Sequence, residues 1–147
     1  MDVGFRRAVA ADLPALVRML ADDARGAEPL PACYVDAFEA IDRDPNQLLL
    51  VAERPGHGPV GTLQITYTPG LSRRGAWRAT IEGLRVAAPL RSGGLGRRML
   101  GHAIGLARAR GCRIVQLTSD KRRTDAIRFY ESLGFSASHE GLKLALD

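Results

Sequence analysis

A glycine-rich loop stands directly in front of a long amphipathic segment, and its residues suit the binding of an anion. The loop reads Arg-Ser-Gly-Gly-Leu-Gly over residues 91–96, after an alternating segment that predicts a strand over residues 78–86. Glycines let the backbone come close to a ligand, and the free amides and dipole of a helix N-terminus attract negative charge. Arg91, Arg97 and Arg98 flank the loop and can add charge-assisted hydrogen bonds to phosphate oxygens. The pattern therefore predicts a cradle for a phosphate-bearing ligand.

Two common nucleotide-binding patterns do not fit this loop. A P-loop requires a lysine after its last glycine, and here Arg97 and Arg98 follow Gly96. A dinucleotide fingerprint that starts at Gly94 requires glycine or alanine where Met99 stands. The pattern that is met is Arg-x-x-Gly-x-Gly.

With two further segments, this loop resembles the acetyl-CoA signature of the GCN5-related N-acetyltransferases, the GNAT family, in which Gln/Arg-x-x-Gly-x-Gly/Ala follows a strand and opens a helix. Residues 81–86 (Ile-Glu-Gly-Leu-Arg-Val) look like the fourth strand of that family. Residues 126–135 (Ala-Ile-Arg-Phe-Tyr-Glu-Ser-Leu-Gly-Phe) look like its later A-x-x-F-Y-E-x-L-G-F signature. Because residues 5–13 also match a common family start, the resemblance covers essentially the whole chain.

The resemblance implies an N-acetyltransferase that uses acetyl-CoA as cosubstrate, needs no metal and acts on a primary amine. Direct attack of the amine is preferred over an acyl-enzyme, because no cysteine or serine is paired with a histidine in a nucleophilic motif. The resemblance assigns two sets of residues to the cosubstrate: strand residues that pair with the pantetheine arm, Leu84, Arg85 and Val86, and loop residues that hold the pyrophosphate, Arg91, Ser92, Gly93, Gly94, Leu95, Gly96 and Arg97.

Tyr130 and Glu82 are the catalytic candidates. By the resemblance, Tyr130 faces the thioester sulfur, where a phenol can protonate the leaving thiolate. The attacking amine must be neutral, and an alkylammonium with a pKa near ~10 must first lose its proton to a base or a water relay. Glu82 is the best-placed base, with a solvent-facing residue or an ion pair with Arg85 as the alternative. Many members have Asn seven residues before the tyrosine, where this chain has Arg123, so we expect that contact to differ.

These groups need a fold that brings strand, loop and helix together, and the periodicity along the chain predicts one. We expect a single α/β domain over residues 1–147, with a central mixed, mostly antiparallel sheet flanked by about four helices. Strands are predicted over residues 5–9, 47–53, 60–68, 78–86 and 113–118, with one or two more within 135–146. Helices are predicted from Asp12 as N-cap to about Arg25-Gly26, from Pro29 or Pro31 to Pro45, from the glycine loop to Gly111, and from Asp125 to Gly134.

The composition fits a globular chain. With 147 residues, 46% of them hydrophobic and 25% charged, it argues against a disordered, collagen-like or membrane-spanning protein. Cys33 and Cys112 lie far apart and predict reduced thiols rather than a disulfide framework or a zinc site. Since neither a signal peptide nor an apolar run of membrane length is found, we expect a cytoplasmic location and no membrane partner.

Positive charge is concentrated in one part of the chain. Residues 71–128 hold 14 of the 21 basic residues and only 3 of the 16 acidic ones. This excess of positive charge indicates an anionic partner. The glycine loop favours the phosphates of acetyl-CoA, while nucleic acid is disfavoured because interleaved aromatic residues are missing. A small-molecule amine is the expected second substrate, and the resemblance also allows a homodimer. The competing interpretation is a non-catalytic module that binds acyl-CoA or nucleic acid.

Overall fold

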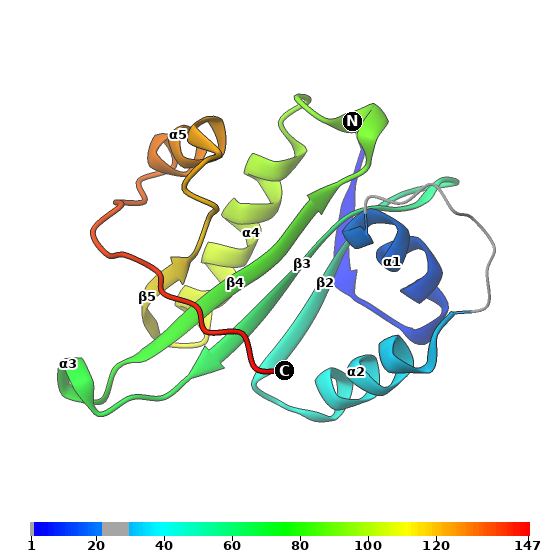
Figure 1. The fold of residues 1–147 in the computed structure, drawn as a ribbon. Helices are drawn as coiled ribbons and strands as arrows, with labels where there is room; N and C mark the ends of the chain where they lie inside the picture. The colour runs from blue at the N-terminus through cyan, green and yellow to red at the C-terminus, as the bar shows by residue number, and fades with distance from the viewer. Residues whose placement is uncertain (1, 22–29) are drawn as a thin grey trace.

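Five strands form one sheet in the order β1-β2-β3-β4-β5 in the computed structural model, which describes residues 2–21 and 30–147 (Figure 1). The strands are β1 (Gly4–Arg7), β2 (Gln47–Arg54), β3 (Gly58–Thr68), β4 (Trp77–Val86) and β5 (Cys112–Leu117). Strands β1 to β4 are antiparallel, and β5 runs parallel to β4 because a helix makes the crossover between them. The predicted mixed, mostly antiparallel sheet is confirmed.

Four helices of at least two turns flank the sheet within the described residues, as predicted. The helices are α1 (Leu13–Ala21), α2 (Ala32–Arg43), α4 (Leu95–Ala109) and α5 (Thr124–Ser132), with a single turn α3 (Ser72–Gly75) and the 3-10 turns η1 (Ala10–Asp12) and η2 (Ala88–Leu90). The predicted helix end near Arg25-Gly26 and the start at Pro29 fall outside the described residues.

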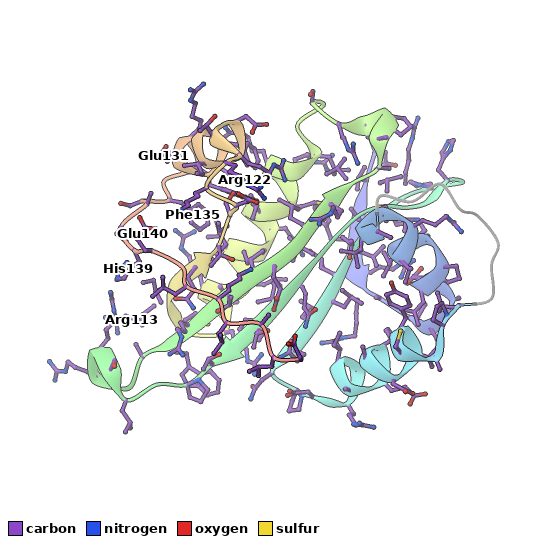
Figure 2. All side chains as sticks on the ribbon, in the orientation of Figure 1. Arg113, Arg122, Glu131, Phe135, His139 and Glu140 are labelled. Atoms are coloured by element: carbon purple, nitrogen blue, oxygen red, sulfur yellow. The ribbon has the colours of Figure 1, made fainter. Side chains whose placement is uncertain are left out.

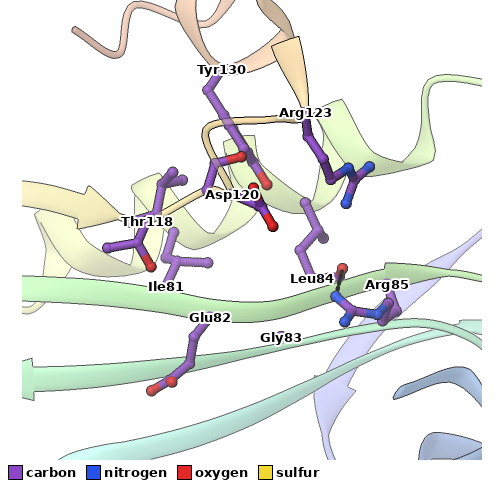
Figure 3. A pocket seen from close by; sticks show the side chains of 11 residues that line it. Ile81, Glu82, Gly83, Leu84, Arg85, Thr118, Asp120, Arg123 and Tyr130 are labelled. Carbon is purple, nitrogen blue, oxygen red and sulfur yellow. Dashed lines mark hydrogen bonds between the residues drawn. The ribbon is translucent and has the colours of Figure 1, made fainter. Parts of the chain in front are cut away.

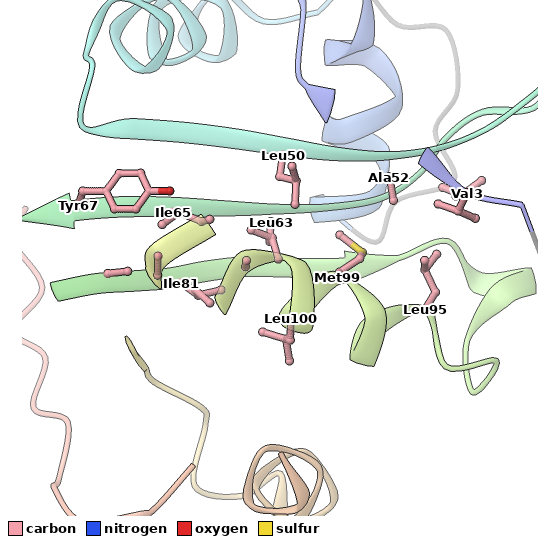
Figure 4. Packing of buried hydrophobic residues seen from close by; sticks show 14 residues of the cluster. Val3, Leu50, Ala52, Leu63, Ile65, Tyr67, Ile81, Leu95, Met99 and Leu100 are labelled. Atoms are coloured by element: carbon pink, nitrogen blue, oxygen red, sulfur yellow. The ribbon is translucent and has the colours of Figure 1, made fainter. Parts of the chain in front are cut away.

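Alternation along β2 gives the sheet a hydrophobic core on each face. Leu50 and Ala52 belong to the larger cluster, which packs against Met99 and Leu100 of α4 (Figure 4). Val51, one residue out of step, is buried in the second cluster with the first two helices. Successive side chains of a strand point to opposite faces, so the sheet lies between α4 on one face and α1 and α2 on the other.

The start of α1 differs from the sequence prediction at Asp12. The N-cap of the opening turn is Val9, and Asp12 lies three residues further on, where its carboxylate accepts the Val9 N–H at 2.8 Å. Arg6 donates to both oxygens of Asp12 at 2.7 and 2.9 Å and also pairs with Glu53. These charge-assisted bonds hold the pKa of Asp12 below its usual value. The side chain thus ties β1 to the first helix.

The strands predicted within residues 135–146 do not form. Residues 136–147, which we call the C-terminal arm, have no regular secondary structure. Leu142, Leu144 and Leu146 are 94, 86 and 90% exposed, so an alternating apolar pattern is present but has no partner strand within the described residues.

Both cysteines are free thiols, Cys33 exposed and Cys112 half-buried. None of the described helices is long and apolar enough to cross a membrane.

Candidate active site

The site begins where β4 and β5 separate. Their last paired residues are Ile81 and Leu117, after which β5 ends while β4 continues to Val86. A register shift against β3 falls in the same stretch of β4, and Gly83 there has a φ of +67°, a conformation that favours glycine. On the β5 side, the last residues of β4 therefore face no strand among the residues described.

A pocket occupies this opening between the strand ends and α5 (Figure 3). Its walls come from three segments: the end of β4, the residues that follow β5, and α5. The lining residues are Ile81, Glu82, Gly83, Leu84, Arg85, Leu117, Thr118, Ser119, Asp120, Arg123 and Tyr130. Both predicted catalytic residues and two of the predicted strand residues are thus brought together, while Val86 lies just beyond the pocket.

The N-terminus of α4 follows β4 through the glycine loop and has no side-chain cap. Gly94 is the N-cap residue, with a φ of +85°, and a Cβ placed there would meet nothing within 4 Å. The first helical N–H with a backbone acceptor is that of Arg98, which donates to the Gly94 carbonyl at 3.1 Å. The amides of residues 95–97 are left without helical partners, as at every helix start. The space beside Gly94 is open, and unpaired amides at a helix start suit an anion.

Three loop residues have roles that the sequence alone did not distinguish. Leu95 is buried in the main core, so only its backbone can reach a ligand. Arg91 donates its Nε to the Val86 carbonyl at 3.2 Å, and Arg97 donates its Nη2 to Ser132 Oγ at 2.9 Å. These arginines fasten the loop to β4 and α4 to α5. The proposed contact of their guanidinium groups with phosphate stays a prediction.

Tyr130 projects from α5 into the pocket (Figure 3). Its ring centroid lies 5.4 Å from that of Phe129 and 6.0 Å from that of Phe135, which fixes the ring without using the hydroxyl. The hydroxyl makes no hydrogen bond to the described residues. Partial burial raises the pKa of the phenol, and Arg123 and Arg85 partly oppose this. The phenol is therefore protonated at neutral pH and free to donate.

Glu82 lies on β4 but points away from Tyr130 (Figure 3). Its side chain is exposed, and the described residues include no ion pair between Glu82 and Arg85. Arg85 instead donates its Nη1 to the Leu84 carbonyl at 2.9 Å. The carboxylate and the phenol thus approach the opening of the sheet from opposite sides, an arrangement that can take a proton on one side and give one on the other.

The residues that follow β5 also line the pocket, and no sequence motif marks them. Asp120 accepts the backbone N–H and the guanidinium of Arg122 at 2.6 to 3.0 Å, and these bonds hold the pKa of its carboxyl far below the usual range. A carboxylate with so low a pKa is a poor base. The bonds between Asp120 and Arg122 instead stabilise the turn that follows β5. Thr118 and Ser119 complete this wall. The sequence feature that could have revealed these residues is their position, because they directly follow a strand that lies beside β4.

Residues 2–21 and 30–147 bear on metal binding as follows from their side chains. No group of three or more His, Cys, Asp or Glu side chains there could hold a metal ion.

Comparison with known proteins relates the chain to a family of enzymes. A sequence model described as the Acetyltransferase (GNAT) family matches residues 13–135. The chain is 33% identical over 106 residues to an aminoalkylphosphonate N-acetyltransferase of Salmonella typhimurium, covering 72% of this chain and 68% of that protein.

Solved structures share the fold over nearly the whole chain. A crystal structure of a transcriptional regulator from Bacillus halodurans C-125 is 49% identical, covers 99% of this chain and 100% of its own, and superposes with a TM-score of 0.92. A crystal structure of a Trypanosoma brucei acetyltransferase is 26% identical, with coverage of 99% and 100% and a TM-score of 0.83.

Proposed function

The chain belongs to the acetyltransferase (GNAT) family, and we propose that it acetylates a small primary amine by direct attack, with Tyr130 as acid and Glu82 as base. GNAT enzymes transfer acetyl to amino groups and use acetyl-CoA as cosubstrate. What supports the proposal for this chain is one observation: the Tyr130 phenol, which makes no hydrogen bond to the described residues, faces the opening between β4 and β5, beside a helix N-terminus that has no side-chain cap.

The glycine loop fits the diphosphate of CoA. The free amides at residues 95–97 and the space beside Gly94 provide donors and room for phosphate oxygens. Gly96 lies against α5, since a Cβ there would be 3.7 Å from Phe129 Cζ. A Cβ at Gly96 would make ordinary van der Waals contact with Phe129, so the helix start and α5 lie within contact distance of each other.

The end of β4 fits the pantetheine arm. Residues 84–86 form the last part of β4, beyond the last pair with β5, and an extended ligand can add alongside such an open strand edge. In this position the thioester lies at the opening of the sheet, and the cosubstrate supplies an activated acetyl carbonyl there. Backbone amides of β4 can then stabilise the negative charge that develops on the carbonyl oxygen.

Three proton transfers complete the reaction, which begins from an ammonium group. Glu82, directly or through water, takes the first proton, so that a neutral nitrogen can bond to the acetyl carbon. The bonded nitrogen then loses a second proton to water. As the carbon–sulfur bond breaks, Tyr130 donates its phenolic proton to the leaving sulfur. The products are the acetylated amine and CoA as a thiol, so that the nitrogen loses two protons and the sulfur gains one.

Aminoalkylphosphonates are the first acceptor class to test, because the relative from Salmonella typhimurium carries that name and shares 33% identity. Thiol release from acetyl-CoA should be measured with aminoalkylphosphonates, polyamines, amino acids, aminoglycosides and a lysine-containing peptide. We expect turnover with at least one small amine and none with the peptide. Absence of turnover with every small amine would contradict the proposal.

A nucleic-acid-binding module is the second candidate, favoured by the Bacillus halodurans structure described as a transcriptional regulator. Thermal unfolding separates the two functions, since a ligand at 100 times its Kd adds about 2.7 kcal/mol to the free energy of unfolding. We expect CoA to raise the unfolding temperature and duplex DNA to leave it unchanged. Stabilisation by DNA but not by millimolar CoA would favour the second candidate instead.

A further inference from the structure

Two arginine side chains line the pocket and have no carboxylate partner among the residues described. Arg85 comes from the end of β4, and Arg123 directly precedes α5. A guanidinium group has several N–H donors, of which Arg85 uses its Nη1 on the Leu84 carbonyl at 2.9 Å. Arg123 donates its backbone N–H to the Asp120 carbonyl at 2.9 Å, and its guanidinium group has no hydrogen-bond partner in residues 2–21 and 30–147. Most donors of both groups are therefore available to a ligand.

The irregularity in β4 brings Arg85 to the same face of the sheet as Glu82. Glu82 pairs with Gln64 of β3 and Arg85 pairs with Thr62, so that the register shifts between the two pairs. Directly opposed residues share a face, and so do residues two apart on one strand. In a regular strand, residues three apart would point to opposite faces. The carboxylate and the guanidinium group therefore start from positions about 7 Å apart along one face.

The charges that line the pocket do not cancel. Asp120 is bound by Arg122 at 2.6 and 3.0 Å, which leaves Glu82 as the lining carboxylate that has no ion pair to a described residue. Against this single negative charge stand the two positive charges of Arg85 and Arg123. A complementary ligand would therefore carry one positive charge and more than one negative charge.

Both arginines act on the reaction site itself. The positive charges of Arg123 and Arg85 oppose the effect of burial on the Tyr130 phenol and so lower its pKa. Figure 3 shows Arg123 extending from the start of α5 toward the end of β4, from which Arg85 comes. An anion that both groups bind would consequently lie close to the phenol.

The cosubstrate, placed as proposed above, does not supply this anion. Its phosphates would be held by the amides at the start of α4, and the pantetheine arm that would follow residues 84–86 carries amides but no charge. Many members of the family have an uncharged Asn where this chain has Arg123, so the pantetheine arm does not require a cation at this position. The anion is therefore sought in the second substrate.

We propose that Arg85 and Arg123 bind an anionic group of the acceptor, and that the site selects short amines that carry a phosphonate or phosphate group. This inference rests on the proposed function, because it assigns the ammonium group of the acceptor to Glu82. A phosphonate or phosphate offers three oxygens and up to two negative charges to the two guanidinium groups, whereas a carboxylate offers less of both. The spacing of Glu82 and Arg85 fits an amine and an anion that are joined by a short carbon chain.

The first test measures binding without turnover. The protein saturated with CoA, which has no acetyl group to transfer, is titrated calorimetrically with 2-aminoethylphosphonate, O-phosphoethanolamine, 3-aminopropanoate and propylamine. We expect the phosphonate or the phosphate ester to bind at least about tenfold more tightly than propylamine, with the carboxylate between them, since hydrogen bonds between charged groups are the strong ones. Comparison of the first two compounds tells which of the two dianions the site prefers. Equal affinity for all four compounds, or no binding of any, would overturn the inference.

Variants then identify the residues. Arg85→Gln and Arg123→Asn should each weaken binding of the preferred dianion about tenfold and change the affinity for propylamine less than twofold. The control is Arg128→Gln, because Arg128 is an exposed arginine of α5 that does not line the pocket, and it should leave both affinities unchanged. If both variants keep the affinity for the dianion, or if they weaken CoA binding instead, the arginines do not bind the acceptor and the inference is wrong.

Thiol release from acetyl-CoA separates this inference from the proposed function. We expect kcat/KM to be at least about tenfold higher for the preferred dianion than for propylamine, and this ratio should fall in both pocket variants. Equal kcat/KM for the two amines would preserve the proposed function and overturn the inference. Tight binding of the dianion without thiol release from any amine would contradict the proposed function, whereas the anion site formed by Arg85 and Arg123 would stand.

Discussion

Replacing Tyr130 with Phe tests the proposed chemistry most directly, because the structure separates the ring from the hydroxyl. The ring is held by Phe129 and Phe135 at centroid distances of 5.4 and 6.0 Å, and Phe keeps both contacts. The hydroxyl has no hydrogen-bond partner among the described residues, so its removal leaves no group unsatisfied. We therefore expect Tyr130→Phe to change the free energy of unfolding by less than about 0.5 kcal/mol.

The effect on the rate should be much larger. A positioned general acid typically contributes a factor of about 10² to 10⁴, which corresponds to about 2.7–5.4 kcal/mol of barrier. Because the glycine loop and the end of β4 are untouched, the KM for acetyl-CoA should stay within about a factor of two, since no ground-state contact is lost. A fall in kcat alone would then be the signature of a proton donor. Since burial raises the pKa of Tyr130, the wild-type rate should not fall through this group until alkaline pH.

The assay is thiol release at saturating amine and acetyl-CoA, with unfolding followed in parallel. Tyr67→Phe is the matched control, because Tyr67 is 6% exposed on β3 and is not among the pocket residues. It should keep kcat. If Tyr130→Phe retains kcat, or if both variants lose it equally, the phenol is not the acid and the assignment from the pocket geometry is wrong.

Three further predictions concern the base, the loop and the N-terminal ion pair. Glu82→Gln should lower kcat at neutral pH, with recovery toward pH 10 where the amine is already neutral; equal loss at all pH values would contradict a base. Gly94→Ala should raise the KM for acetyl-CoA more than that for the amine and cost about 1 kcal/mol of stability, because its φ is +85°; calorimetric titration of CoA checks this, and unchanged affinity would count against the cradle. Asp12→Asn should lower the free energy of unfolding by about 2 kcal/mol, discounted for the partial exposure of Arg6. Since the pKa of Asp12 is lowered from 3.8, this stabilisation is complete above that pH and lost as the pH falls below it, so urea unfolding of the variant should show a weaker acid dependence than the wild type.

The elements that position the site could be predicted from the sequence because they carry strong local signals. The apolar face of α4, the glycines before it and the alternation of β4 each specify a local structure without long-range information. Gly94 is an example, since its positive φ meets the requirement of a sharp turn into the helix. The order of strand, loop and helix then follows from the chain itself.

The parts that the sequence did not reveal depend on contacts between distant segments. The role of Asp12 depends on Arg6 and Glu53, which approach it only when β1 pairs with β2. Asp120 enters the pocket because β5 lies beside β4, and no local motif marks it. The predicted last strands failed for a related reason: alternation predicts a strand, but not whether a neighbouring strand is available to pair with it.

The concentration of arginine in residues 71–128 has a different meaning once the side chains are placed. Arg110 lies over the rings of Tyr67 and Trp77 at 4.2 and 5.8 Å and donates to Asn46, and Arg122 is held by a carboxylate of its own loop. These two arginines therefore have partners within the fold, Arg110 on neighbouring strands and Arg122 within its own loop. In the proposed site, the amides at the start of α4 would attract phosphate whatever the net charge of the chain. The same charge excess that suggests nucleic acid is therefore compatible with an enzyme whose anion site is built from backbone.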